Sequence, residues 1–176
     1  MANDMRNQLI KAGYAPGNDR RTYNQGKQNN GYASRNMNNM SGYVAPLNYS
    51  PVDDGEKVIK NIKKNKYNEI ALTTSQIRKF LTAVNVVRNK VELFKAQNKA
   101  CDTLSRELTA EVKFLKVNLL YQAGKDKSGT VKNFVEVANL EAIINDIDND
   151  LQKFAKFCKY VEALVAYHKF LGGKDK

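Results

Sequence analysis

The sequence contains few of the residue types on which several common classes of protein depend. Its 176 residues include no tryptophan, one histidine and two cysteines, and all three prolines lie within the first 51 positions. Cys101 and Cys158 are far apart in sequence, and with His168 they make no zinc-binding set. We therefore expect no metal or other cofactor. Two cysteines without a pairing pattern also fit the reducing cytoplasm, so we expect a cytoplasmic protein.

Long hydrophobic runs are absent as well. No apolar stretch approaches the roughly 18 residues that a membrane-spanning helix needs, and the N-terminus has no apolar segment of the secretory type. Acidic residues are scarce, because 29 lysines and arginines face 18 aspartates and glutamates, which gives a formal charge of +11. This charge favours a polyanionic partner, with RNA, DNA and an anionic membrane surface all eligible, although it is also compatible with a role in solubility alone.

The first 51 residues differ in composition from the rest. They are rich in asparagine, glycine and tyrosine, and six basic residues against two acidic ones make them basic. Apolar residues are too sparse here to offset the entropy of ordering, so we expect residues 1–51 to be a disordered extension. Two interpretations stay open. The tyrosines and arginines are suited to stacking on single-stranded bases, and a solvated linker has the same composition.

Residues 52–176 show helical periodicity throughout and no convincing strand alternation. We predict an all-α fold, a compact bundle of five to six helices. The expected helices follow Asp53 and Asp54, start at Thr73 or Thr74, run over about 102–122, cover 131–138 and 140–147, and end with about 151–171.

The helix expected over residues 102–122 carries two apolar stripes. The first consists of leucines and a valine, and the second contains Phe114, Val117 and Tyr121. Two stripes predict a central helix that is buried on two sides. Gly124 follows at the position where glycine commonly ends a helix.

No catalytic arrangement stands out. The acidic run 146–150 lacks the glycine and the final glutamate of a calcium loop, so Asp148 or Asp150 is better explained as a helix cap. Residues 124–130 have phosphate-loop residue types in the wrong order and follow a helix, which leaves only an exposed basic loop. His168 lies on an apolar helix face, where a buried structural histidine is expected. We expect a protein that is not an enzyme.

Four segments in order resemble the small subunit of the type III-A CRISPR effector, the Csm complex. They are residues 72–80 (LTTSQIRKF), 112–126 (VKFLKVNLLYQAGKD), 131–140 (VKNFVEVANL) and 157–175 (FCKYVEALVAYHKFLGGKD). The resemblance covers the body from about residue 55 to 175. The extension has no recognisable counterpart in that family.

The resemblance implies a short helical bundle that is present in several copies, which associate into a short filament inside the complex. The expected neighbours are the large signature subunit and the backbone subunits that hold the CRISPR RNA. The basic surface would line the groove that receives target RNA, and it would contact the RNA backbone without reading its sequence. Target cleavage would belong to the backbone subunits.

The resemblance also implies which cations face RNA. By position in the matching motifs these are Arg78, Lys79, Lys116, Lys125 and Lys169. Lys132 and Arg88 are added because of their charge and their proximity to those motifs.

Two other functions remain open. In the first, the protein is a structural spacer whose cations pair with acidic patches on neighbouring subunits. In the second, the lysine-rich helix near residues 58–66 binds a membrane surface.

Overall fold

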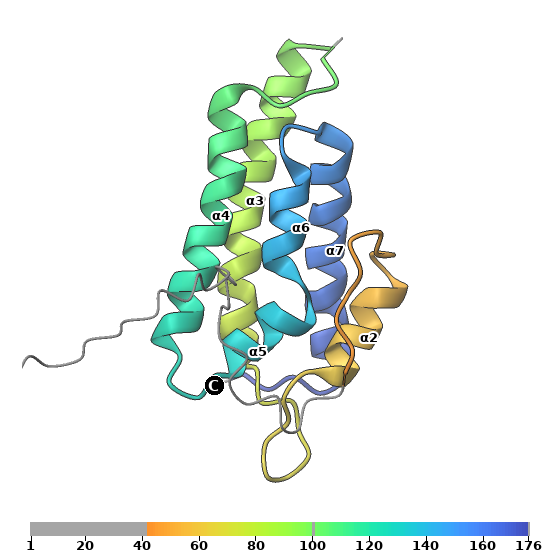
Figure 1. The fold of residues 1–176 in the computed structure, drawn as a ribbon, viewed down its shortest axis with the longest axis vertical. Helices are drawn as coiled ribbons and strands as arrows, with labels where there is room; N and C mark the ends of the chain where they lie inside the picture. Colours follow the sequence, from red (N-terminus) through yellow and green to blue (C-terminus); the bar gives the residue numbers. More distant parts are fainter. Residues whose placement is uncertain (1–41, 100, 176) are drawn as a thin grey trace, which may run out of the picture. The chain divides into compact units, whose positions relative to one another are not determined.

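A computed structural model describes residues 42–99 and 101–175, and Figure 1 shows their fold. These residues form six helices and no strand beyond two isolated bridges, which confirms the predicted all-α bundle. The helices are α2 (Asp53–Asn61), α3 (Thr74–Gln97), α4 (Arg106–Lys125), α5 (Thr130–Val137), α6 (Leu140–Ile147) and α7 (Leu151–Phe170). Most of the expected extension, residues 1–41, lies outside the described residues.

The helices α3, α4, α6 and α7 run side by side, while α5 lies across one end and α2 packs beside α7 (Figure 1). The apolar stripe of α3 faces the inside of this arrangement, as its periodicity predicted, and Ile77, Phe80 and Val84 are each 1% exposed. Phe80 meets Phe157 of α7 edge to face, with ring centroids 6.3 Å apart. Burial of such side chains is the main force that holds the bundle together.

The start of α3 follows from local sequence. Thr73 accepts a hydrogen bond from the Gln76 backbone N–H at 3.2 Å, and the Gln76 side chain accepts one from the Thr73 N–H at 2.9 Å. This reciprocal pair of hydrogen bonds satisfies two of the backbone N–H groups that have no partner within the helix at its N-terminus. The helix therefore begins at Thr74, one of the two positions that the sequence predicted.

Helix α4 departs from the prediction in two respects. Gly124 does not end it, because the helix continues to Lys125 and the turn is formed by Asp126, whose carboxylate accepts from the backbone N–H groups of Ser128 and Val131. The second apolar stripe is not buried. Phe114 is 58% exposed, Val117 50% and Tyr121 68%, because no described element covers that side of the helix.

Residues 43–50 were expected to belong to the disordered extension, but in the structure they pack along the bundle. Tyr49 is 5% exposed and its ring lies 4.5 Å from that of Tyr160, while Ala45 exchanges hydrogen bonds with the backbone of Val137 and the side chain of Asn139. Composition misled the prediction here, because the groups that hold this segment lie far along the chain. We call residues 43–50 the strap.

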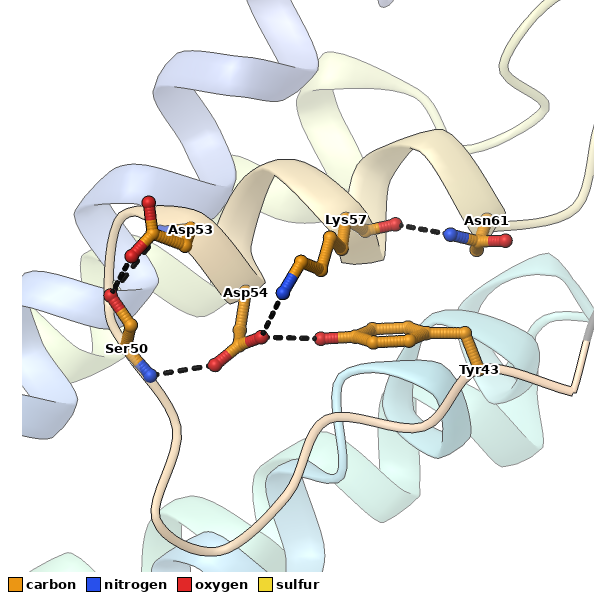
Figure 2. A network of polar contacts seen from close by, with 6 residues as sticks. All are labelled: Tyr43, Ser50, Asp53, Asp54, Lys57 and Asn61. Carbon is orange, nitrogen blue, oxygen red and sulfur yellow. Dashed lines mark hydrogen bonds and ion pairs between the residues drawn. The ribbon is translucent and has the colours of Figure 1, made fainter.

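Asp54 joins the strap to α2, as Figure 2 shows. Its carboxylate accepts hydrogen bonds from the Ser50 backbone N–H at 2.7 Å, the Tyr43 hydroxyl at 2.9 Å and the Lys57 ammonium at 3.3 Å. Burial alone would raise the pKa of Asp54, but these donors outweigh it and lower the pKa. Asp53 and Asp54 thus lie in the first turn of α2, after Val52 at the cap position, rather than capping the helix themselves.

Candidate nucleic-acid interface

The α2–α3 loop, the first turns of α3, the α4–α5 loop, α5 and the residues after α7 come together at one end of the bundle (Figure 1), and ten of the 22 lysines and arginines among the described residues belong to these segments or to the last turns of α4 and α7 that lead into them. We call this region the basic end. Ten cations belong to it, against only four carboxylates, Glu69, Asp126, Glu136 and Asp175. The cations are Lys63, Lys64, Lys66, Arg78, Lys79, Lys125, Lys127, Lys132, Lys169 and Lys174.

Direct contacts fasten these segments to one another. The Lys63 backbone N–H donates to the Asn133 side chain at 2.5 Å, and its ammonium donates to the Ser128 carbonyl at 2.8 Å, which ties the α2–α3 loop to the α4–α5 loop and α5. Lys174 pairs with Glu69 at 2.5 Å. The basic end is therefore a fixed surface built from segments that are far apart in the sequence.

The residues after α7 form a clasp over the start of α3. We define the clasp as residues 171–175. The Thr74 backbone N–H donates to the Lys174 carbonyl at 3.1 Å, and the Gly173 N–H donates to the His168 carbonyl at 2.8 Å. Gly172, with φ of 96°, lets the chain turn back there without strain. The clasp thus satisfies another free donor of the α3 start.

His168, in the last turn of α7, holds the clasp against the bundle. It is fully buried, and its Nε2–H donates to the Leu72 carbonyl at 2.8 Å, while Nδ1 has no hydrogen-bond partner in the described part of the chain. Burial lowers the pKa of His168, and the bond to Leu72 only partly opposes that effect. The ring is therefore neutral at pH 7 and structural, as expected from its apolar helix face.

Three of the seven predicted RNA-facing cations are exposed and unpaired. Arg78, Lys79 and Lys125 form no ion pair with any carboxylate among residues 42–99 and 101–175. Arg78 and Lys79 lie in the second turn of α3, and Lys125 is the last residue of α4, not a loop residue as expected.

Lys79 and Lys125 lie at the same end of the packed helices α3 and α4. The two helices are antiparallel, and Lys90 pairs with Glu111 across them at 2.7 Å. Counting eleven residues along each helix from the Lys90–Glu111 pair toward the basic end leads to Lys79 on α3 and Gln122 on α4, which are therefore level with each other. Lys125 lies about one turn beyond Gln122. Unpaired charges so placed produce a positive field over this end of the bundle.

The other four predicted cations have partners. Lys132 lies 3.9 Å from Glu136, and Lys169 lies 3.2 Å from Asp175, both in exposed pairs at the basic end that water and salt weaken. Lys116 donates to the neutral Asn145 side chain at 2.9 Å, so it keeps its charge but lies midway along α4. Arg88 forms an ion pair with Glu162 of α7, away from the basic end.

Sequence reasoning assigned no site role to several members of the basic end. Lys127, which is exposed and has no ion pair in the described residues, was seen only as part of a basic loop. Lys63, Lys64 and Lys66 were expected in or beside a lysine-rich helix near residues 58–66, whereas they follow the end of α2 and enter the α2–α3 loop. Their charge was visible in the sequence, but their position beside the α4–α5 loop was not.

The exposed chemistry of the basic end is suited to binding polyanions. The described residues contain no cluster of three histidine, cysteine or acidic side chains that would hold a metal ion. None of the six helices combines the length and the apolar composition that crossing a bilayer demands. The basic end presents exposed ammonium and guanidinium groups, which match phosphate oxygens in charge and hydrogen bonding.

Comparison with known proteins gives a consistent result. The family model described as Csm2 Type III-A matches residues 52–174. A "CRISPR system Cms protein Csm2" from Streptococcus thermophilus is 36% identical over 124 residues, which cover 70% of this chain and 93% of the relative. Proteins of the same name from Mycobacterium tuberculosis (strain CDC 1551 / Oshkosh) and Enterococcus italicus are 38% and 33% identical, over 68% and 74% of this chain and 90% and 91% of theirs.

Proposed function

From the premise that the chain belongs to the Csm2 family and is a structural subunit of the type III-A Csm complex, we propose that its basic end binds RNA. The ligand is the sugar–phosphate backbone of CRISPR RNA paired with target RNA. Several copies of the subunit line the groove that holds this duplex in the cytoplasm. The proposed role is non-catalytic, and the cations of the basic end act in it as contacts to phosphate.

The observation that carries the proposal is the set of unpaired cations at one end. Arg78, Lys79 and Lys125 are exposed and form no ion pair in the described residues, whereas Arg88 forms an ion pair with Glu162. Contacts of this type fix the position of a nucleic acid but carry no sequence information. Base pairing with the guide supplies the specificity in RNA-guided systems generally.

Salt dependence of RNA binding tests the proposal. A single-stranded RNA carries the same phosphate backbone and serves as the probe, and for a single strand the logarithm of affinity falls with the logarithm of salt concentration by about 0.7 per phosphate contact. Replacing Arg78 and Lys79 by alanine should therefore lower that slope by about 1.4 per copy and weaken capture of target RNA. Both side chains are exposed, so the helical signal and the unfolding midpoint should change little.

A matched control removes the same charge elsewhere. Lys113 and Lys153 are exposed and pair with Asp148 and Asp146 at the opposite end of the bundle, at 3.2 Å and 3.1 Å. Their double alanine variant should keep the slope of the parent. Equal slopes for both double variants would contradict an RNA-binding role for the basic end.

The structural spacer remains the second candidate function, and the uncovered apolar side of α4 favours it, because such a surface suits contact with protein. Gel filtration of the assembled complex separates the two functions. If Arg78 and Lys79 bind neighbouring subunits, the double variant should be lost from the complex. If they bind RNA, the complex should form and fail only in RNA capture.

A further inference from the structure

The α2–α3 loop projects beyond the end of the bundle (Figure 1) and carries an exposed tyrosine at its tip. We call residues 63–71 the finger. Tyr67 lies in the turn of the finger, and its side chain is 70% exposed. Single exposed aromatic residues are common on protein surfaces, so the surroundings of Tyr67 decide whether it has a function.

Backbone hydrogen bonds hold the two sides of the finger together. The Ala71 N–H donates to the Lys63 carbonyl at 3.0 Å. The Asn65 N–H donates to the Glu69 carbonyl at 2.8 Å. Within the turn, the side-chain oxygen of Asn65 accepts from the backbone N–H groups of Tyr67 and Glu69 at 2.9 Å and 3.1 Å. The turn is therefore held by backbone groups, and the Tyr67 side chain takes no part in it.

The base of the finger is fastened to the bundle. Ile62 and Leu72, the residues on either side of it, are 4% and 1% exposed. Glu69 pairs with Lys174 after α7, and the Lys63 backbone N–H donates to a side chain of α5. The tip is therefore held at a defined place on the basic end.

Two lysines flank the tyrosine at this tip. Lys64 and Lys66 are exposed and form no ion pair within residues 42–99 and 101–175. The Lys66 ammonium lies 4.9 Å from the centroid of the Tyr67 ring, a distance at which a cation is attracted to an aromatic face. The tip thus combines a flat aromatic surface with positive charge, which match the base and the phosphate of a nucleotide.

We infer that Tyr67 stacks on an unpaired base of RNA while Lys64 and Lys66 contact the neighbouring phosphates. This inference rests on the proposed function and adds a contact to a base, whereas the other cations of the basic end contact only the backbone. Stacking selects no sequence, because every base has an aromatic face. Neighbouring bases cover both faces of a base inside a duplex, so the finger needs an unpaired nucleotide or the end of a strand.

Binding of two single strands to the full chain tests the inference. One is a short oligouridylate, and the other is an abasic ribose–phosphate strand with the same number of phosphates. Tyr67→Leu keeps an apolar side chain without an aromatic face. It should lower the affinity for oligouridylate by about fivefold or more and leave the affinity for the abasic strand unchanged. Tyr67→Phe is the matched control, because it keeps the ring and should bind both strands as the parent does.

The outcomes separate this inference from the proposed function. If Tyr67→Leu binds oligouridylate as tightly as the parent, or loses affinity equally for both strands, the inference is overturned and phosphate binding stands. A parent that binds neither strand at low salt would contradict the proposed function and the inference together. Loss of Tyr67→Leu from the assembled complex, at unchanged RNA affinity, would identify a protein partner for Tyr67 and overturn the inference.

Fluorescence gives a second readout at the tip itself. The chain has no tryptophan, so Tyr67→Trp introduces a single reporter. Its emission should be quenched when oligouridylate binds and stay constant when the abasic strand binds. Leu93→Trp is the control, because Leu93 is 66% exposed near the opposite end of α3, and its emission should stay constant with both strands. Equal quenching at the two positions, or none at position 67 while oligouridylate binds, would refute stacking by the finger.

Discussion

Replacing Gly173 by alanine would place a methyl carbon in steric clash with the ring of His168. The added Cβ would lie 2.1 Å from Cε1, 2.3 Å from Nδ1 and 2.6 Å from Nε2. The ring has no room to move, because it is fully buried and held by its hydrogen bond to Leu72. The clasp must therefore shift, which weakens the bonds of Gly173 to His168 and of Thr74 to Lys174.

The cost follows from these losses. Each hydrogen bond contributes about 0.5–1.5 kcal/mol, and overpacking of a well-packed site costs about 1–3 kcal/mol. We expect Gly173→Ala to lower the free energy of unfolding by roughly 2–3 kcal/mol. Urea unfolding followed by circular dichroism measures this change, and an unchanged slope against urea would show that the unfolding transition itself is the same.

Gly124→Ala is the control, and we expect it to change the free energy of unfolding in the opposite direction. Gly124 lies inside α4, is exposed, and has no neighbouring atom within 4 Å of an added Cβ. Alanine there should raise stability by about 0.5–1 kcal/mol, because it favours the helix more than glycine does. The reasoning about the clasp would be refuted if Gly173→Ala proved as stable as the parent.

Two further predictions concern buried polar groups. Tyr43→Phe removes a donor from the Asp54 carboxylate and should lower the free energy of unfolding by about 1 kcal/mol in urea titrations; no change would mean that this hydrogen bond adds nothing to the stability of the folded unit. Burial lowers the pKa of His168, so the folded state resists protonation. Stability should be complete above about pH 7 and decline as the pH falls below about 6.5, where the unfolded histidine takes up a proton. A His168→Gln variant should lack this decline, and an equal decline in both proteins would exclude His168 as its source.

Local patterns were sufficient for the helices and their core sides. The Thr73–Gln76 capping pair and the stripe through Ile77 and Phe80 are encoded within a few residues, so the start and the buried side of α3 were predicted correctly. Asp150, proposed as a possible cap, caps α7 through the N–H groups of Gln152 and Lys153. Such features depend on backbone geometry that neighbouring residues determine.

The errors arose where partners lie far along the chain. Periodicity showed that Phe114 and Tyr121 share one side of a helix, but it does not show whether that side meets the same chain or another. The strap was assigned to the extension because its composition resembles it, while its anchor, Tyr160, is more than 100 residues away.

The same limit applies to the candidate site. The sequence showed seven cations, yet pairing decides which of them keep an uncompensated charge. Arg88 is neutralised by Glu162, which is 74 residues away, while Arg78 and Lys79 have no such partner in the described residues. Only the folded structure distinguishes the cations that form ion pairs from those that do not.

The clasp gives a physical reason why segments 72–80 and 157–175 act together. His168 bonds to Leu72 across 96 residues, and Lys174 bonds to Thr74, so the C-terminal residues hold the helix turn that carries Arg78 and Lys79. The two kinds of variant should therefore differ in outcome. Loss of both cations should weaken RNA binding at constant stability, whereas Gly173→Ala should lower both, because it displaces the support of cations that are still present.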